Sequence, residues 1–311
     1  MTSSKIFEIV RHGDLVPCSS AFIDSHTPGS DQKQNFTIIG SGVSENPEQH
    51  VHITTTPGFN IGAAMQPPNC RNSMHTHKTA EIFFVFKGTW RFFWGISGNA
   101  GDIVLKEGDL FNIPTGMFRG FENIGDQYGT LMAILGADDA GGGVRWAPQV
   151  IEEAKSYGLI LGDDGNIYDS KKHQFLPKEV KPMPPMTDYE ISSMREPSVV
   201  EIITNHISRY SDLMALSKTG ICKVIGNESL MGADPHVELD FISRDSEKNH
   251  FYQTKKYEVL IGMEGYWSLE FDHGIQTTIN PGDTCLIYPN SNRKIRPVRS
   301  GITTLFRVRQ V

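Results

Sequence analysis

The chain has 311 residues, of which 38% are hydrophobic and 21% are charged, a composition that provides enough apolar side chains for two domains of ordinary size. Its formal net charge is −7 and no dense run of Lys or Arg offsets it, which excludes a general affinity for nucleic acid or for anionic membranes. No segment approaches the roughly 18 apolar residues of a membrane span, and the first residues lack the apolar core of a signal peptide. We therefore expect a cytoplasmic protein that binds a small molecule, with no nucleic-acid or membrane partner.

The cysteines provide no covalent framework. Cys18, Cys70, Cys222 and Cys285 are isolated in the sequence, without a Cys-x-x-Cys pair. We expect reduced, partly buried thiols rather than disulfides or a zinc ribbon.

We interpret residues 1–35 as an N-terminal arm. Within it, Arg11-His12-Gly13 resembles the phosphate-binding motif of histidine phosphatases. Those enzymes need a parallel sheet with flanking helices, and the helical segments for such a fold are missing from this sequence. We therefore expect this motif to form a surface turn.

Residues 36–146 have the pattern of a β domain. Short runs rich in Phe, Ile, Val, Thr and Trp alternate with clusters of Gly, Pro and Asn. The regular spacing of these runs is typical of a small barrel or sandwich. The predicted strands cover residues 50–54, 60–65, 81–86, 90–94, 102–105, 110–113 and 130–135.

Residues 147–200 are predicted to be a helix followed by a linker. Pro148 stands near the start of the helical pattern and Gly158 follows its end, as a helix prefers. Residues 178–185 are rich in proline and predict an extended surface linker. The domain boundary is expected there.

The segment MHTHKTAEIFFVFKG contains three possible metal ligands. His75 and His77 are two residues apart and share one face of a strand, and Glu81 can return to that face after a short bend. Two imidazoles and a carboxylate are a known donor set for a reactive divalent metal. The spacing predicts a metal site, because packing alone explains it poorly.

A second motif follows after Gly88: Gly108, Pro114, Gly116 and Asn123 have the spacing of a second conserved segment. Together the two motifs resemble those of the cupin superfamily. Asn69 stands where the family usually has its leading glycine, and Arg119 stands where the family has its third histidine.

Arg119 cannot be a metal ligand, because a guanidinium stays protonated and has no free lone pair. One interpretation keeps the metal on His75, His77 and Glu81, with Arg119 holding an anionic group of the substrate. In the other, the metal is absent and Arg119 pairs with Glu81, which leaves a binding barrel with neutral histidines.

Residues 201–311 repeat the pattern in degenerate form. Glu258 precedes Gly265 by the interval that separates Glu81 from Gly88, but Tyr252 and Thr254 occupy the histidine positions. The chain thus resembles a bicupin. The resemblance implies an all-β fold of two double-stranded β-helix (jelly-roll) barrels with a short helical linker, the metal site lying in residues 36–146 and the degenerate barrel in residues 201–311.

Other residues near the motifs offer weaker alternatives. His50 and His52 alternate on a predicted strand and could replace the missing ligand, as could Gln66, but no spacing rule ties them to His75. Several aromatic residues surround the motifs, and those that face inward should line the ligand cavity.

The layout is similar to that of gentisate-type and quercetin-type dioxygenases. The resemblance implies a metal-dependent dioxygenase for a small aromatic or enolic organic acid, with Fe(II) favoured and Mn, Ni or Zn as alternatives. A non-oxidative decarboxylase or isomerase, in which Glu81 moves protons, and a metal-free binding or sensing barrel are the other hypotheses. Cupin barrels commonly associate through sheet edges, so we expect a homodimer.

Overall fold

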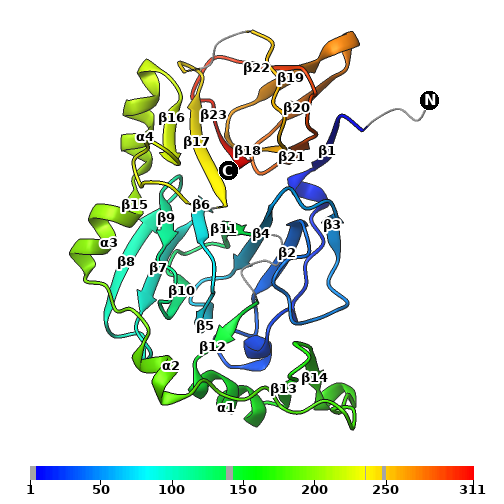
Figure 1. Ribbon diagram of the computed structural model, residues 1–311, viewed down its shortest axis with the longest axis vertical. Helices are drawn as coiled ribbons and strands as arrows, with labels where there is room; N and C mark the ends of the chain where they lie inside the picture. Colours follow the sequence, from blue (N-terminus) through cyan, green and yellow to red (C-terminus); the bar gives the residue numbers. More distant parts are fainter. Residues whose placement is uncertain (1–4, 138–142, 235, 247–249) are drawn as a thin grey trace.

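The computed structural model describes residues 5–137, 143–234, 236–246 and 250–311. Two β units lie one above the other, and the helices gather along one side and at the far end of the first unit (Figure 1). The predicted all-β fold of two jelly-roll barrels is confirmed. None of the helices in the described residues is long and apolar enough to cross a membrane.

The first barrel consists of two facing sheets. All seven predicted strand segments are confirmed within it. The larger sheet contains, in spatial order, β15 (Ile207–Ser208), β9 (Leu110–Ile113), β6 (Glu81–Lys87), β11 (Gly129–Gly136), β4 (Phe59–Gln66), β2 (Gln34–Ile39) and β3 (Val51–Ile53). The smaller sheet contains β12 (Arg145–Trp146), β5 (Arg71–Thr76), β10 (Arg119–Asn123), β7 (Thr89–Trp94) and β8 (Gly101–Lys106).

The second barrel repeats this arrangement. Its larger sheet contains β1 (Phe7–Val10), β21 (Thr284–Ile287), β18 (Glu258–Glu264), β23 (Thr304–Gln310), β17 (Val237–Ser243) and β16 (Cys222–Ile225). Its smaller sheet contains β20 (Gln276–Ile279), β19 (Trp267–Phe271) and β22 (Arg293–Pro297).

The larger sheets of the two barrels pack against each other. On β6, Phe83 and Val85 belong to the core of the first barrel, whereas Ile82 and Phe84 belong to the core between the barrels. Phe84 meets Phe306 of β23 with ring centroids 4.5 Å apart. A strand that is buried on both faces needs a continuous apolar run, which explains the sequence Ile-Phe-Phe-Val-Phe.

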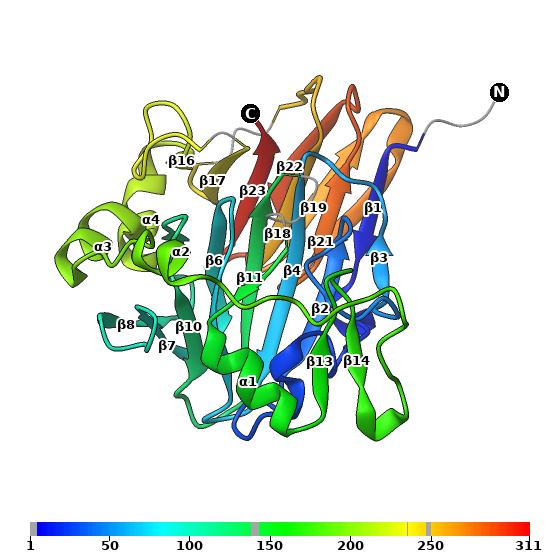
Figure 2. The same cartoon turned by 60° about the horizontal axis from the view of Figure 1, so that its bottom comes forward.

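Each barrel receives a strand from the segment that precedes the other one. β1 precedes the first barrel but pairs with β21 of the second, whereas β15 precedes the second barrel and pairs with β9 of the first. In Figures 1 and 2, β1 accordingly lies with the second barrel. The backbone then turns through η1 (His12–Asp14) and η2 (Ile23–His26) back to the first barrel. The N-terminal arm is therefore part of the interface between the barrels.

Two glycines allow these exchanged segments to approach closely. A Cβ atom on Gly108 would lie 2.3 Å from the Tyr210 ring, and one on Gly282 would lie 2.7 Å from the His12 ring. Both glycines also have positive φ, a conformation that other residues adopt at a cost.

The connection between the barrels begins with the predicted helix, α1 (Pro148–Ser156), which ends as expected before Gly158. A small hairpin, β13 (Leu159–Leu161) and β14 (Ile167–Asp169), follows, then η4 (Ser170–Lys172) and the extended proline-rich stretch. The chain continues through α2 (Asp188–Ser192), α3 (Val199–His206), α4 (Tyr210–Leu216) and η5 (Ser217–Thr219), and η6 (Asp272–Gly274) lies within the second barrel. Residues 201–216, which the sequence assigned to that barrel, are thus largely helical.

Candidate metal centre

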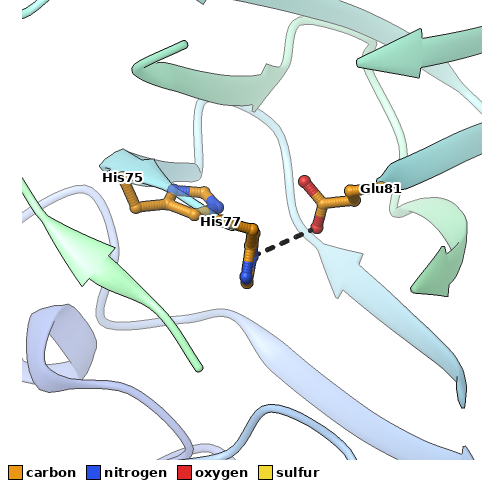
Figure 3. Close-up of side chains that lie close together, drawn as sticks. All are labelled: His75, His77 and Glu81. Carbon is orange, nitrogen blue, oxygen red and sulfur yellow. Dashed lines mark ion pairs between the residues drawn. The ribbon is translucent and has the colours of Figure 1, made fainter. Parts of the chain in front are cut away.

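Three residues from one continuous stretch converge at the inner face of the first barrel. His75 lies near the end of β5, His77 lies just beyond this strand, and Glu81 begins β6. A nitrogen of each imidazole and one carboxylate oxygen lie within 4.8 Å of one another, and Figure 3 shows the three side chains close together. All three are buried, so the bend after β5 brings the donors together inside the barrel.

The two histidines are oriented by backbone carbonyls. His75 Nδ1 is 2.7 Å from the carbonyl oxygen of Ser73, and His77 Nδ1 is 2.9 Å from that of Gly143. A carbonyl can only accept, so Nδ1 carries the proton in both rings and each Nε2 keeps a lone pair. This is the arrangement that supporting hydrogen bonds impose on metal-bound histidines.

Burial also keeps both imidazoles neutral. It lowers the pKa of His75 well below the usual value, and the Arg119 cation and His77 lower it further. Burial, followed by Arg119, lowers the pKa of His77 to about 4, against the opposing effect of Glu81. The donor set at neutral pH is therefore two neutral imidazoles and one carboxylate oxygen, which suits a divalent transition metal.

Arg119 is directed at Glu81. Its Nε atom donates to Glu81 Oε2 over 3.0 Å, a second guanidinium nitrogen bonds the same oxygen, and a third donates to the His75 carbonyl over 3.2 Å. Glu81 Oε1 remains on the side of His77, 3.5 Å from its Nε2. Arg119 is 2% exposed and is not among the described residues that line the adjoining cavity. Both the triad and the Arg119–Glu81 pair of the second interpretation are thus present together.

A cavity of about 60 Å³ adjoins the triad. Among the described residues, its lining includes no Lys, Arg or Asp, and Glu81 is its single carboxylate. Of the aromatic residues near the two motifs, Phe83 and Phe121 line it. The other aromatic side chains around the cavity come from separate segments and are Phe22, Phe36 and Trp146. The donors therefore face a small, largely apolar space.

Residues 63–135 match the family model of the cupin domain, and the match includes all three candidate ligands. The barrels also resemble known bicupins over their whole length. A variant of the oxalate decarboxylase of Bacillus subtilis is 12% identical and aligns with 100% of this chain and 78% of its own, with a TM-score of 0.57. Residues 63–135 thus form a cupin domain, and the whole chain has the fold of the bicupins.

Two dioxygenases are also similar to this chain, one in structure and one in sequence. The salicylate 1,2-dioxygenase of Pseudaminobacter salicylatoxidans is 13% identical, and the alignment covers 99% of this chain and 84% of that one with a TM-score of 0.55. The 3-hydroxyanthranilate 3,4-dioxygenase of Neurospora crassa is 26% identical over 99 residues. That match covers 30% of this cupin and 55% of the relative, so the chain spans about half the length of the curated protein it matches.

The second cupin barrel contains the same ion pair without the histidines. Arg293 contacts Glu258 at 2.8 Å, and both side chains are fully buried. Tyr252 pairs across the sheet with Arg293, as His75 pairs with Arg119, which confirms Tyr252 as the residue at the first histidine position. The Tyr252 hydroxyl donates to Glu258 over 2.9 Å. The arginine–glutamate pair is therefore a shared feature of both barrels and forms in one of them without imidazoles.

Sequence reasoning missed an ion pair that supports His75. Lys33 and Asp24 are both completely buried and contact each other, and the second oxygen of Asp24 accepts a hydrogen bond from the Ser73 amide at 3.0 Å. The Ser73 carbonyl in turn orients His75. Both residues lie in the N-terminal arm, outside the two motifs, and no local pattern connects them with β5.

A second missed residue is Glu45, which anchors the wall of the cavity. Its carboxyl group accepts hydrogen bonds from Trp146 Nε1 at 2.6 Å and from the Ile23 amide at 2.8 Å. Trp146 lies against His75, with ring centroids 5.4 Å apart. Glu45 thereby fixes an aromatic side chain that covers one candidate ligand.

The alternative ligands lie elsewhere. His52 uses both ring nitrogens, one with the Thr37 carbonyl at 2.7 Å and one with the Val16 amide at 3.0 Å, and His50 is exposed beside it. Gln66 donates to Asn72 over 2.8 Å. Among the described residues, the candidate metal group contains His75, His77 and Glu81 alone.

Proposed function

We propose that this cupin holds a divalent metal through His75, His77 and Glu81 and acts as a dioxygenase on a small organic acid. The observation that carries the proposal is the convergence of two Nε2 atoms and one carboxylate oxygen on a small, largely apolar cavity. Fe(II) is the favoured ion. Its chemistry, when bound, is to polarise substrate oxygens and to activate dioxygen.

The residues of the chain supply position and environment. Ser73 and Gly143 hold the imidazoles in one tautomer, so that both Nε2 atoms can donate to the metal without reorganisation. The aromatic side chains of the lining lower the polarity of the site, which strengthens polar interactions inside it. The polar, uncharged side chains of the lining, which can orient a substrate by hydrogen bonds, are Asn35, Thr37, Ser44, Gln49 and Asn72.

The size of the cavity favours an enolic or short aliphatic acid over an aromatic one. A cavity of roughly 150 Å³ is known to hold benzene, whereas this one measures about 60 Å³. The dioxygenase names of two relatives support oxidative chemistry, although those proteins act on aromatic acids.

A non-oxidative decarboxylase is the second candidate. The bicupin fold is shared with oxalate decarboxylases, and the Bacillus subtilis enzyme contains Mn(II) centres. Oxygen consumption separates the candidates, because a dioxygenase consumes one O₂ per turnover whereas a decarboxylase releases CO₂ without net uptake of O₂.

The decisive experiment is metal analysis of the purified protein and of His77→Ala, with His50→Ala as the matched control. We expect near-stoichiometric divalent metal in the wild type and in His50→Ala, and loss of the metal in His77→Ala with an unchanged fold by circular dichroism. Equal metal in all three proteins, or none after reconstitution, would contradict the proposal and favour the metal-free binding barrel.

A further inference from the structure

Arg119 controls how Glu81 is presented to the cavity. All its hydrogen bonds to Glu81 end on Oε2, which leaves Oε1 as the oxygen on the side of the histidines. Another guanidinium nitrogen bonds the carbonyl of His75, so the arginine spans the strands that carry two of the donors. Since the guanidinium is buried and already paired, it has little capacity left for a substrate.

The charges of these residues cancel. Imidazoles that donate to a metal are neutral, so His75 and His77 add no charge, and the single negative charge of Glu81 is offset by Arg119. The nearby Lys33–Asp24 pair also sums to zero. In the described part of the cavity lining, no other ionised side chain is present. A divalent cation in this site would therefore carry two positive charges that the protein does not balance, in a poorly solvated environment where such charge is costly.

We propose that Arg119 is a positioning residue that makes the metal and a small carboxylate anion bind together. It holds Glu81 so that one carboxylate oxygen can donate to the metal, and it cancels the negative charge of Glu81. An anion is therefore needed to balance the positive charge of the metal and to fill its remaining coordination positions. The inference rests on the proposed metal site and assigns its substrate class: a carboxylate of few heavy atoms, recognised by the metal and not by Arg119. A cavity of about 60 Å³ fits such an anion.

The second barrel provides the matched control. Arg293 pairs with Glu258 as Arg119 pairs with Glu81, but Tyr252 and Thr254 stand in place of the histidines. Removing Arg293 therefore breaks the corresponding buried ion pair without touching the candidate ligands, while Arg307 remains 3.8 Å from Glu258. A change in metal affinity that occurs in the Arg119 variants but not in Arg293→Met therefore results from the position of Arg119 at the metal site, and not from the loss of a buried ion pair in general.

The test measures Co²⁺ affinity by titration of the metal-free full chain, with and without saturating formate, and with formamide as the uncharged probe of equal size. In the wild type we expect formate to tighten Co²⁺ binding about tenfold or more and formamide to have no such effect. Arg119→Met should bind Co²⁺ alone about tenfold more tightly and lose most of the formate effect, because the charge of Glu81 is no longer cancelled. Arg119→Lys retains the charge and should retain the formate effect.

The outcomes separate this inference from the proposed function. If the wild type binds Co²⁺ but formate and formamide act alike, the inference fails and the metal site stands. The same conclusion follows if Arg119→Met and Arg293→Met bind Co²⁺ equally. If the wild type binds no Co²⁺, or His77→Ala binds it as well as the wild type does, the proposed function itself fails. If Arg119→Met does not fold, the inference still fails when formate and formamide act alike on the wild type or when Arg119→Lys loses the formate effect.

Discussion

Arg11, in the arm before the first barrel, forms an ion pair with Asp283 of the second barrel at 2.6 Å. Asp283 also accepts the amide of His12 at 3.0 Å. The opposite exchange repeats this contact, because Arg209 pairs with Asp109 at 2.7 Å. The Arg-His-Gly sequence is thus part of a turn that fastens the arm, and its counterpart is the Arg209-Tyr210 turn of the linker.

The aspartates of these two contacts should contribute more to the free energy of unfolding than the arginines do. Asp283 is buried and accepts two backbone amides as well as Arg11, whose side chain is 34% exposed. We expect Asp283→Ala to lower the free energy of unfolding by about 2–3 kcal/mol, and Arg11→Ala by at most about 1 kcal/mol. Urea denaturation measures both. Equal effects of the two substitutions would show that the amides contribute little.

Loss of the buried Lys33 should weaken both the fold and the metal site. Lys33→Met leaves the Asp24 carboxylate buried and unpaired, which should cost about 3–5 kcal/mol of unfolding free energy. Metal affinity should also fall, because Asp24 fixes the Ser73 peptide that orients His75. The double variant Asp24→Asn, Lys33→Met removes both charges and should recover part of the stability. A normal Co²⁺ affinity of Lys33→Met would show that the Lys33–Asp24 pair does not support the metal site.

Glu45 should give the protein a pH-dependent stability. Burial raises the pKa of its carboxyl from 4.5 to about 8, against the two hydrogen bonds it accepts and the charge of Lys33. Between these values the unfolded chain has released the proton and the folded chain retains it. Stability should therefore fall as the pH rises through this window, by at most about 1.4 kcal/mol per pH unit.

The comparison with Glu45→Gln isolates this effect. The variant keeps an uncharged side chain of similar shape, and contributions from the histidines cancel in the difference between the two proteins. Urea denaturation from pH 5 to pH 9 should give a wild-type stability that declines relative to that of the variant. Parallel curves would mean that Glu45 titrates alike in the folded and unfolded states.

Filling the cavity should separate substrate binding from metal binding. Ala133 lies on β11, lines the cavity and is not a candidate ligand. We expect Ala133→Leu to bind Co²⁺ within about threefold of the wild type but to lose the binding of formate to the metal-loaded protein, because the larger side chain occupies the free volume. Visible absorption of the Co²⁺ form reports both events. Unchanged formate binding would place the anion outside this cavity.

Four features could be predicted from the sequence: the cupin resemblance, the two-barrel fold, the loss of the histidines from the second barrel, and the grouping of His75, His77 and Glu81. These features follow from short spacings, because residues two apart on a strand share a face and a short bend brings a third residue back to it. Most strands of the first barrel could also be predicted, because their β-branched and aromatic runs are local features of the sequence. The predicted segments did not include β5, β10 and β12, which lack that pattern, and they also omitted β2, although its Phe36-Thr37-Ile38-Ile39 run has it.

The surroundings of the three donors depend on tertiary contacts and could not be predicted from the sequence. From the sequence, Arg119 could either bind a substrate or pair with Glu81. In the structure it pairs with Glu81, because the register of β10 places it opposite His75. The support from Lys33, Asp24 and Glu45 depends on how the arm folds back over the first barrel, and the Arg11–Asp283 contact joins residues at opposite ends of the chain. Such contacts depend on topology, which brings distant segments together without leaving a spacing pattern in the sequence.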